Sequence, residues 1–314
     1  MMARLPIAVL ACALVLTAIG STAEAQDNQA TIAIPLGEQE LQTEWRKLSE
    51  EQAEQITFRN MRGLVRAMHK YHDAHGCLPP AVVPNSDLAV EKRLSGFVLL
   101  LPFLDATDYA KDGSDSKDGQ RFFTPELSAM AAALYKTMDL TKAWDDPVNL
   151  QAAETIVPAF LAPQVGAFRD KNGHAVSHFA LVRGAIGKDD GAFTETFGIT
   201  YFPSEERKLR ISDGTANTLA LGQINDGLGP WTAAGTATAR FVYHRADNST
   251  APTFRSRHAG GCYFVNCDSG AYFLDLDKTS ANTLHALATR GGDEPIDSSS
   301  LFRYESAAEW KKKK

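Results

Sequence analysis

Apolar residues recur at spacings of three and four between residues 49 and 76, which is the period of an amphipathic helix. Ser49 followed by Gln52 resembles a capping box at the start of this helix. One face carries Met61, Leu64, Val65, Met68, His72 and His75. Gly76 suits the residue after a helix, and the prolines at 79 and 80 prevent its continuation. The pattern predicts a long helix that ends within MHKYHDAHGCLPPA, residues 68–81.

The second half of the chain has a different pattern, in which short apolar runs alternate with Gly, Asp and Ser. These runs predict strands at 177–187, 198–202, 219–224, 239–244, 260–266 and 271–276. A closing helix is expected at 279–292, capped by Ser280 or Thr279, ended by Gly291 and facing the core with Leu284 and Leu287. We therefore predict an α+β fold, in which helices pack on one side of an antiparallel sheet.

The region between these two parts contains further elements. A buried apolar segment is expected at 94–104, and helices are expected at 126–138 and within 143–157. The Gly- and Asp-rich stretch at about 105–128 indicates a polar surface insertion. The predicted organisation is a polar lead-in at 26–48, one domain at 49–297 containing the insertion, and a tail at 298–314.

The first 25 residues resemble a cleaved signal peptide. A short basic start precedes an apolar run, and the Ala-Glu-Ala at 23–25 fits a small-x-small cleavage site. We expect the mature chain to begin near Gln26, in the periplasm or outside the cell. No later segment has the roughly 20 apolar residues of a membrane helix, so no membrane span is expected in the mature chain.

Composition adds little to this picture. The chain has 314 residues, is 44% hydrophobic and carries a formal net charge of -6, which gives no indication of a nucleic-acid partner. The basic WKKKK at 310–314 is interpreted as part of a solvated tail.

Three cysteines remain after the leader: Cys77, Cys262 and Cys267. On one extended strand Cys262 and Cys267 would lie about 16 Å apart, which is too far for a disulfide. A bridge from Cys77 to either of them is left open. Three thiols without a CxxC pair lack the spacing of a structural zinc site, and no metal or other cofactor is expected.

Three histidines, His69, His72 and His75, follow one another at intervals of three around Asp73. They spread over about 120° of the helix surface, so we interpret them as a partly buried helix end rather than a metal site. A metal-dependent hydrolase at this helix end is the corresponding enzyme hypothesis. The sequence contains no GxSxG elbow, P-loop or GxGxxG, and no catalytic residue is assigned.

Two other stretches could bind a polar ligand. Asp213, Thr215 and Asn217 have side chains suited to turns or to a ligand. His258 and Asp268 flank one strand and would lie about 30 Å apart if the intervening chain were extended, so direct joint catalysis is not expected. The CDSG stretch at 267–270 suits a hairpin turn with its glycine in the left-handed region.

Several blocks together resemble the exported pilin-like family known as domain of unknown function 1559, expanded in planctomycete bacteria. The blocks lie at 60–81, 98–104, 134–150, 160–163, 177–187, 211–223 and 279–294, with Pro230-Trp231 between the last two. His258 and Asp268 match the family's type II secretion-associated H-x9-DG motif. The resemblance places His69, Tyr71, His72, Asp73, Gly76, Pro79 and Pro80 on a recurrent pattern that ends a pilin-type helix, with no catalytic role implied.

Two positions depart from the family pattern. The leader is of the ordinary signal-peptidase type, so the apolar helix used for filament packing would be lost on cleavage. The glycine expected after Asp268 is Ser269, and Gly270 follows one residue later, so we predict a shifted turn of the same hairpin.

The resulting functional hypothesis is an exported, non-enzymatic interaction module of the envelope or of secretion, with protein partners possible. A protein that binds a small extracytoplasmic ligand or a glycan is the alternative. The sequence leaves the partner, the oligomeric state and filament assembly open.

Overall fold

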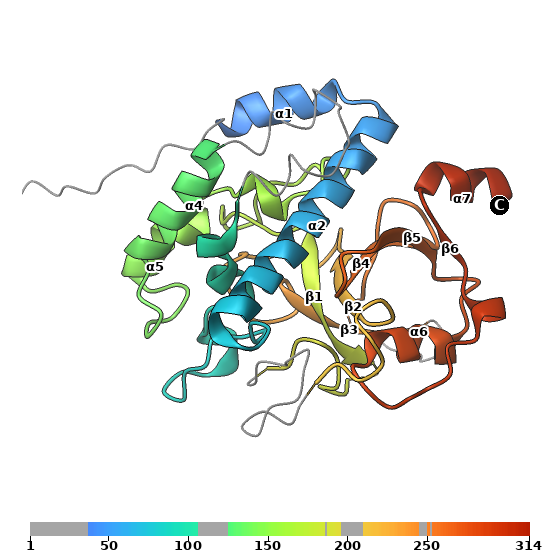
Figure 1. Cartoon of the computed structure of the whole chain (residues 1–314). Helices are drawn as coiled ribbons and strands as arrows, with labels where there is room; N and C mark the ends of the chain where they lie inside the picture. Colours follow the sequence, from blue (N-terminus) through green and yellow to red (C-terminus); the bar gives the residue numbers. More distant parts are fainter. Residues whose placement is uncertain (1–36, 106–124, 186, 196–209, 245–249, 252) are drawn as a thin grey trace, which may run out of the picture. The chain divides into compact units, whose positions relative to one another are not determined.

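A long helix and a six-stranded sheet form the centre of the computed structural model (Figure 1). The structure describes residues 37–105, 125–185, 187–195, 210–244, 250–251 and 253–314, all within one unit, Ile32–Lys314. The predicted leader at 1–25 and the predicted strand at 198–202 lie outside the described residues. The helices are α1 (Glu38–Arg46), α2 (Glu50–His75), α4 (Pro125–Thr137), α5 (Pro147–Glu154), α6 (Ala281–Ala288) and α7 (Ala307–Lys313), with short 3₁₀ helices at Val90–Lys92, Gly96–Phe103, Pro158–Phe160 and Ser298–Ser300.

The sheet is mixed, with the strand order β3-β1-β2-β4-β5-β6. The strands are β1 (Phe179–Ala185), β2 (Leu219–Gln223), β3 (Ala239–Val242), β4 (Gly261–Asn266), β5 (Ala271–Asp275) and β6 (Arg303–Tyr304). The prediction of a purely antiparallel sheet is wrong for one pair, because β3 runs parallel to β1, with Leu181 opposite Ala239. Strand β2 occupies one edge of β1, so β3 joins the other edge after a crossover.

Helix α2 begins and ends where local sequence predicts. The Gln52 amide N–H donates to the Ser49 hydroxyl at 3.1 Å, and the Gln52 side chain accepts from the Ser49 N–H at 2.8 Å. Gly76 follows the last residue with a φ of 71°, a conformation that costs glycine little. In the part of the chain that is described, no helix combines the length and apolar character needed to cross a membrane.

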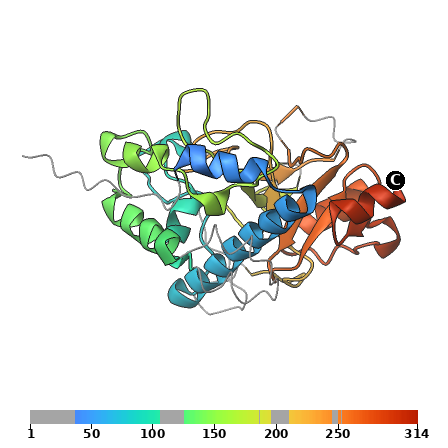
Figure 2. The ribbon, with the colours of Figure 1, turned by 90° about the horizontal axis from the view of Figure 1, so that it is seen from above.

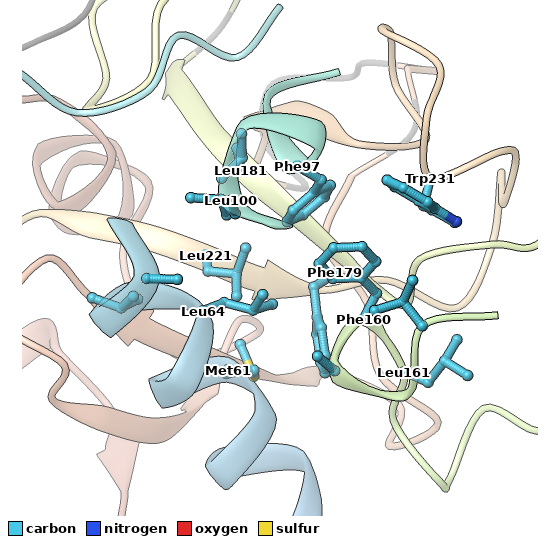
Figure 3. Close-up of a cluster of buried hydrophobic side chains, with 14 of the residues drawn as sticks. Met61, Leu64, Phe97, Leu100, Phe160, Leu161, Phe179, Leu181, Leu221 and Trp231 are labelled. Atoms are coloured by element: carbon cyan, nitrogen blue, oxygen red, sulfur yellow. The ribbon is translucent and has the colours of Figure 1, made fainter. Parts of the chain in front are cut away.

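One core lies between α2 and the sheet. Figure 3 shows Met61 and Leu64 of α2 beside Leu221 of β2 and Phe179 of β1. The segment predicted to be buried at 94–104 forms the Gly96–Phe103 helix, whose Phe97 packs on Phe160 with ring centroids 5.1 Å apart. In both ribbon views α4 and α5 lie on the far side of α2 from α7 (Figures 1 and 2).

The opposite face of the sheet carries a second core, formed with α6. Leu284 and Leu287 are buried there, as predicted, against Ala180 and Val182 of β1 and Phe264 of β4. The expectation that helices pack on one side only is therefore wrong. Successive residues of a strand point to opposite faces, and here both faces are apolar, so each needs a cover. Helix α6 ends at Ala288, before the predicted Gly291, while Ser280 caps its start.

The segment predicted to be a solvated tail, residues 298–314, is folded. It supplies β6 and α7, and the side chains of Ala307 and Trp310 are buried. The lysines that follow Trp310 are exposed. The prediction of a solvated tail is therefore correct only for these lysines. Of the predicted insertion at 105–128, residues 125–128 form the first turn of α4 and 106–124 lie outside the described residues. The predicted polar lead-in contains α1, which buries Leu41 and Trp45.

The three cysteines are free and buried, so the disulfide that the sequence left open does not occur in the structure. Cys262 belongs to the core under α6, whereas Cys267 belongs to the core under α2. Burial raises the pKa of both thiols well above the usual value. Neither thiol therefore has the thiolate character that a nucleophile requires.

His178 is completely buried at the start of β1 and is neutral. Its Nδ1 accepts the Ala162 N–H at 2.9 Å, and its Nε2 lies 2.5 Å from the Ala167 carbonyl oxygen, which identifies Nε2 as the protonated nitrogen. Burial lowers the pKa of His178 to about 4 from 6.5. The side chain thus ties the 162–167 loop to the sheet only in its uncharged form.

We expect this histidine to make the fold sensitive to acid. Above pH 6.5 neither state of the protein binds the proton; between pH 6.5 and about 4 only the unfolded state binds it, so stability falls, and the loss levels off below pH 4. The contribution of His178 reaches about 3 kcal/mol. Urea unfolding at pH 7, 5.5 and 4.5 measures it, with His178→Gln as the non-titrating control. Equal pH slopes for both proteins would contradict the assignment.

Candidate functional site

The three histidines at the end of α2 have separate surroundings. The Nε2 atom of His69 lies 2.6 Å from the carbonyl oxygen of Cys267, at the end of β4. His72 lies beside Asp73 at 3.9 Å, and His75 stacks with Tyr71 at a centroid distance of 4.2 Å. Among the described residues no group of three or more His, Cys, Asp or Glu side chains could hold a metal ion. His69 therefore connects the helix to the end of β4, whereas His72 and His75 belong to its last turn.

Asp213, Thr215 and Asn217 form a turn with bonds inside the fold. Asp213 Oδ1 accepts the N–H groups of Gly292 and Asp293, both at 3.2 Å, which ties the turn to the segment after α6. Asn217 Nδ2 donates to the Asp213 carbonyl at 3.1 Å. The carbonyl oxygen of Thr215 accepts the Asp268 N–H at 3.2 Å. These bonds are what a structural turn requires, and they bring the turn next to the β4–β5 hairpin.

His258 and Asp268 lie at opposite ends of β4, as the strand length predicts. Asp268 Oδ1 accepts the Gly270 N–H at 2.8 Å inside the hairpin turn. The left-handed residue of this turn is Ser269, with a φ of 74°, whereas Gly270 does not have a positive φ. The expected shift of the turn to Gly270 is therefore wrong. The hydrogen bond from the Gly270 N–H to the Asp268 side chain closes the turn around Ser269, so Ser269 adopts the left-handed conformation.

Ser269→Gly is expected to stabilise the protein. A non-glycine residue in the left-handed region costs about 1–2 kcal/mol, part of which the greater freedom of glycine in the unfolded chain offsets. We expect a net gain of about 0.5–1 kcal/mol in the free energy of unfolding. Urea denaturation measures this gain, with Gly270→Ala as the comparison at the neighbouring position. A loss of stability in Ser269→Gly would contradict the turn geometry.

His258 is part of a buried polar cluster at the other end of β4. Its Nε2 atom lies 3.2 Å from the hydroxyl of Tyr263, which is also hydrogen-bonded to the Glu54 carboxylate. The rings of Tyr263, Phe273 and Trp310 surround the imidazole edge-on, at centroid distances of 5.5–6.2 Å. Burial, together with the charges of Lys311 and Arg257, lowers the pKa of His258 to about 4. A neutral imidazole enclosed in this way supports the packing of β4, β5 and α7.

Two carboxylates of the first turns of α2 hold this cluster. Glu54 accepts the Ala307 N–H at 2.6 Å, and its burial raises the pKa of the carboxyl group. Glu50 pairs with Lys311 at 2.5 Å and with Arg257 at 2.7 Å. The hydrogen bond from Lys311 is the main cause that lowers the pKa of Glu50. The start of α2, the loop before β4 and helix α7 therefore meet at one place.

The segment Phe254–Arg255–Ser256–Arg257–His258 alternates in burial. Phe254, Ser256 and His258 are buried, whereas Arg255 and Arg257 are exposed. Phe254 packs on Phe264 at 5.3 Å, and the Arg255 N–H donates to the Gln223 carbonyl at 3.0 Å, so the segment is held against the sheet. This extended period-two arrangement points both guanidinium groups outward.

An open groove of about 700 Å³ lies along this segment. Its lining comes from residues 225–226, 243–244, 253–261, 276–277 and 284. The groove therefore borders the predicted residue His258, and its exposed charged groups are Arg255 and Arg257 together with the carboxylates of Asp226 and Asp277. A volume of this size is within the roughly 300–1,000 Å³ of small-molecule sites. Recognition of a polar molecule is the chemistry that such a lining supports.

Asp213 and Asn217 line a second hollow of about 500 Å³, and Asp268 lines a third of about 570 Å³. The predicted binding residues are thus distributed over three places and do not form one site. Sequence reasoning missed Arg255, Arg257, Glu50 and Lys311. The alternation of the two arginines with Phe254, Ser256 and His258 is the signal that could have identified them.

Comparison of the chain with models of protein families, with curated proteins and with solved structures found no match.

Proposed function

We propose that this protein is an exported, pilin-like interaction module of the cell envelope, which binds other molecules and carries out no reaction. The proposal joins the signal-peptide pattern of residues 1–25 and the order of sequence blocks at 60–294 with the geometry of the groove. The groove along residues 253–261 is the recognition surface in this proposal.

The proposal rests mainly on one observation. Three of the histidines are engaged inside the fold: His258 with Tyr263, His178 with the 162–167 loop, and His69 with Cys267. The groove beside His258 exposes the guanidinium groups of Arg255 and Arg257, which suit binding rather than proton transfer, together with the carboxylates of Asp226 and Asp277. This contrast also favours the ligand- or glycan-binding alternative within the same proposal, and it gives no support to a hydrolase at His69, His72 and His75.

Export is tested by the N-terminus of the protein isolated from its native cells. We expect sequencing to begin at Gln26, because cleavage after Ala25 follows the small-x-small pattern. Recovery of the protein with Met1 intact, from the cytosolic fraction, would contradict export.

Binding is tested by sedimentation of the purified mature chain with insoluble envelope material. We expect the protein to pellet with the envelope and to remain in the supernatant with envelope-free buffer. Failure to pellet at low and at physiological salt would contradict the proposed function.

A further inference from the structure

A basic face borders the groove. Arg255 and Arg257 have side-chain exposures of 64% and 44%, and Lys311 of α7, which shares Glu50 with Arg257, has an exposure of 45%. Lys314 reaches across to the same loop, where its Nζ lies 3.4 Å from the Ala259 carbonyl oxygen. We define the basic face as Arg255, Arg257, Lys311 and Lys314.

The local carboxylates do not neutralise this face. Glu50 is shared between Arg257 and Lys311, so that group of three keeps a positive charge. Asp226 accepts from the buried Arg240 at 3.0 Å and lies 3.7 Å from Arg255, so this second group also keeps a positive charge. Asp277 lines the groove as well, and with it Glu50, Asp226 and Asp277 are three carboxylates against the four cations of the basic face and Arg240. The whole chain has a formal net charge of -6, and the basic face therefore stands out against an acidic molecule.

The partner that suits this face is hydrophilic. Among the described residues, the large hydrophobic side chain that is exposed is Val148, at the start of α5. Insertion into a membrane surface requires exposed apolar side chains beside the basic ones, and protein interfaces are centred on aromatic and aliphatic anchors. Neither feature accompanies Arg255, Arg257 or α7. An extended anionic molecule rich in hydroxyl groups has the complementary chemistry.

We propose that the groove and the basic face bind an acidic polysaccharide. Its carboxylate or sulfate groups pair with the arginines and lysines of the basic face, and one or two sugar units occupy the groove. Arginine is suited to this role because its planar donors bind two oxygens of one anionic group. The proposal rests on the proposed binding function and names the class of ligand for that surface.

The test measures binding of the mature chain to three polymers by isothermal titration calorimetry at 50 mM and 300 mM NaCl. Polygalacturonate supplies carboxylates, dextran sulfate supplies sulfate esters, and unmodified dextran is the neutral control. We expect at least one acidic polymer to bind, with affinity at least tenfold lower at the higher salt, and dextran not to bind. Equal binding of dextran, or no binding of either acidic polymer, overturns the proposal.

Two double variants locate the site. Arg255→Gln/Arg257→Gln is expected to lower the affinity at least tenfold, because it removes both charges at the groove. Lys136→Gln/Lys171→Gln removes the same charge from exposed positions elsewhere and is expected to change affinity less than twofold. An equal loss of affinity in both double variants would show that net charge alone attracts the polymer, and it would contradict the assignment of the binding site to the groove. Thermal unfolding of each variant verifies that it remains folded.

The envelope sedimentation experiment separates the two proposals. Retention on envelope material by a protein that binds neither acidic polymer overturns the polysaccharide assignment and leaves the interaction function in place. Tighter binding to vesicles of phosphatidylglycerol than to either polysaccharide would assign the basic face to lipid and also overturn the inference. Loss of envelope retention contradicts the interaction function itself.

Discussion

Arg240→Met is expected to lower the free energy of unfolding by about 3–5 kcal/mol. The Arg240 side chain is fully buried at β3 and donates to five oxygens: Asp226 Oδ1 and the carbonyls of Thr236, Thr253, Asp226 and Gly227. Methionine fills part of the volume but leaves those carbonyls without their donor, and a buried unsatisfied acceptor costs about 1–3 kcal/mol.

Urea unfolding followed by far-UV circular dichroism measures the effect. Arg255→Gln is the matched control, since Arg255 faces the same carboxylate at 3.7 Å but is 64% exposed, and an exposed pair contributes at most about 1 kcal/mol. A loss below 1 kcal/mol in Arg240→Met would mean that Arg240 does not hold the groove together. The residue matters for the proposed function because Asp226 and Thr253 line the groove.

Trp310→Ala is expected to cost about 3–5 kcal/mol, the usual range for removing a buried large aromatic side chain. Trp310 is 4% exposed, packs on Phe273 at a centroid distance of 5.0 Å and donates from Nε1 to Asp275 Oδ2 at 2.8 Å. Its removal opens the cover of His258 and Tyr263 and weakens the attachment of α7.

Trp310→Phe separates packing from hydrogen bonding. It keeps most of the apolar contact and loses the bond to Asp275, so we expect a smaller loss, of about 1–2 kcal/mol. Circular dichroism is the appropriate signal, because the substitution itself alters tryptophan fluorescence. If Trp310→Ala unfolds at the same urea concentration as the unchanged protein, α7 is not part of the cooperative fold.

The candidate site was only partly predictable. His258 does border the groove, but Asp268 lies at the other end of β4 and the turn at 213–217 lines a different hollow. The segments that line the groove lie up to about 60 positions apart in the chain, from Asn225 to Leu284. No local sequence pattern predicts that the side chains of such distant segments will line the same groove. The outward direction of Arg255 and Arg257 depends on the attachment of their segment to β2.

The sequence by itself determined the local elements. The capping box at Ser49, the left-handed Gly76, the Ser280 cap of α6 and the apolar runs of β1, β2, β3, β4 and β5 all depend on conformational preferences within a few residues. The tertiary structure decided the parallel pairing of β3 with β1, the cover of both faces of the sheet, and the return of Trp310 to Asp275. Each of these joins positions that are distant in the chain, and its free energy comes from partners whose location only the assembled fold provides.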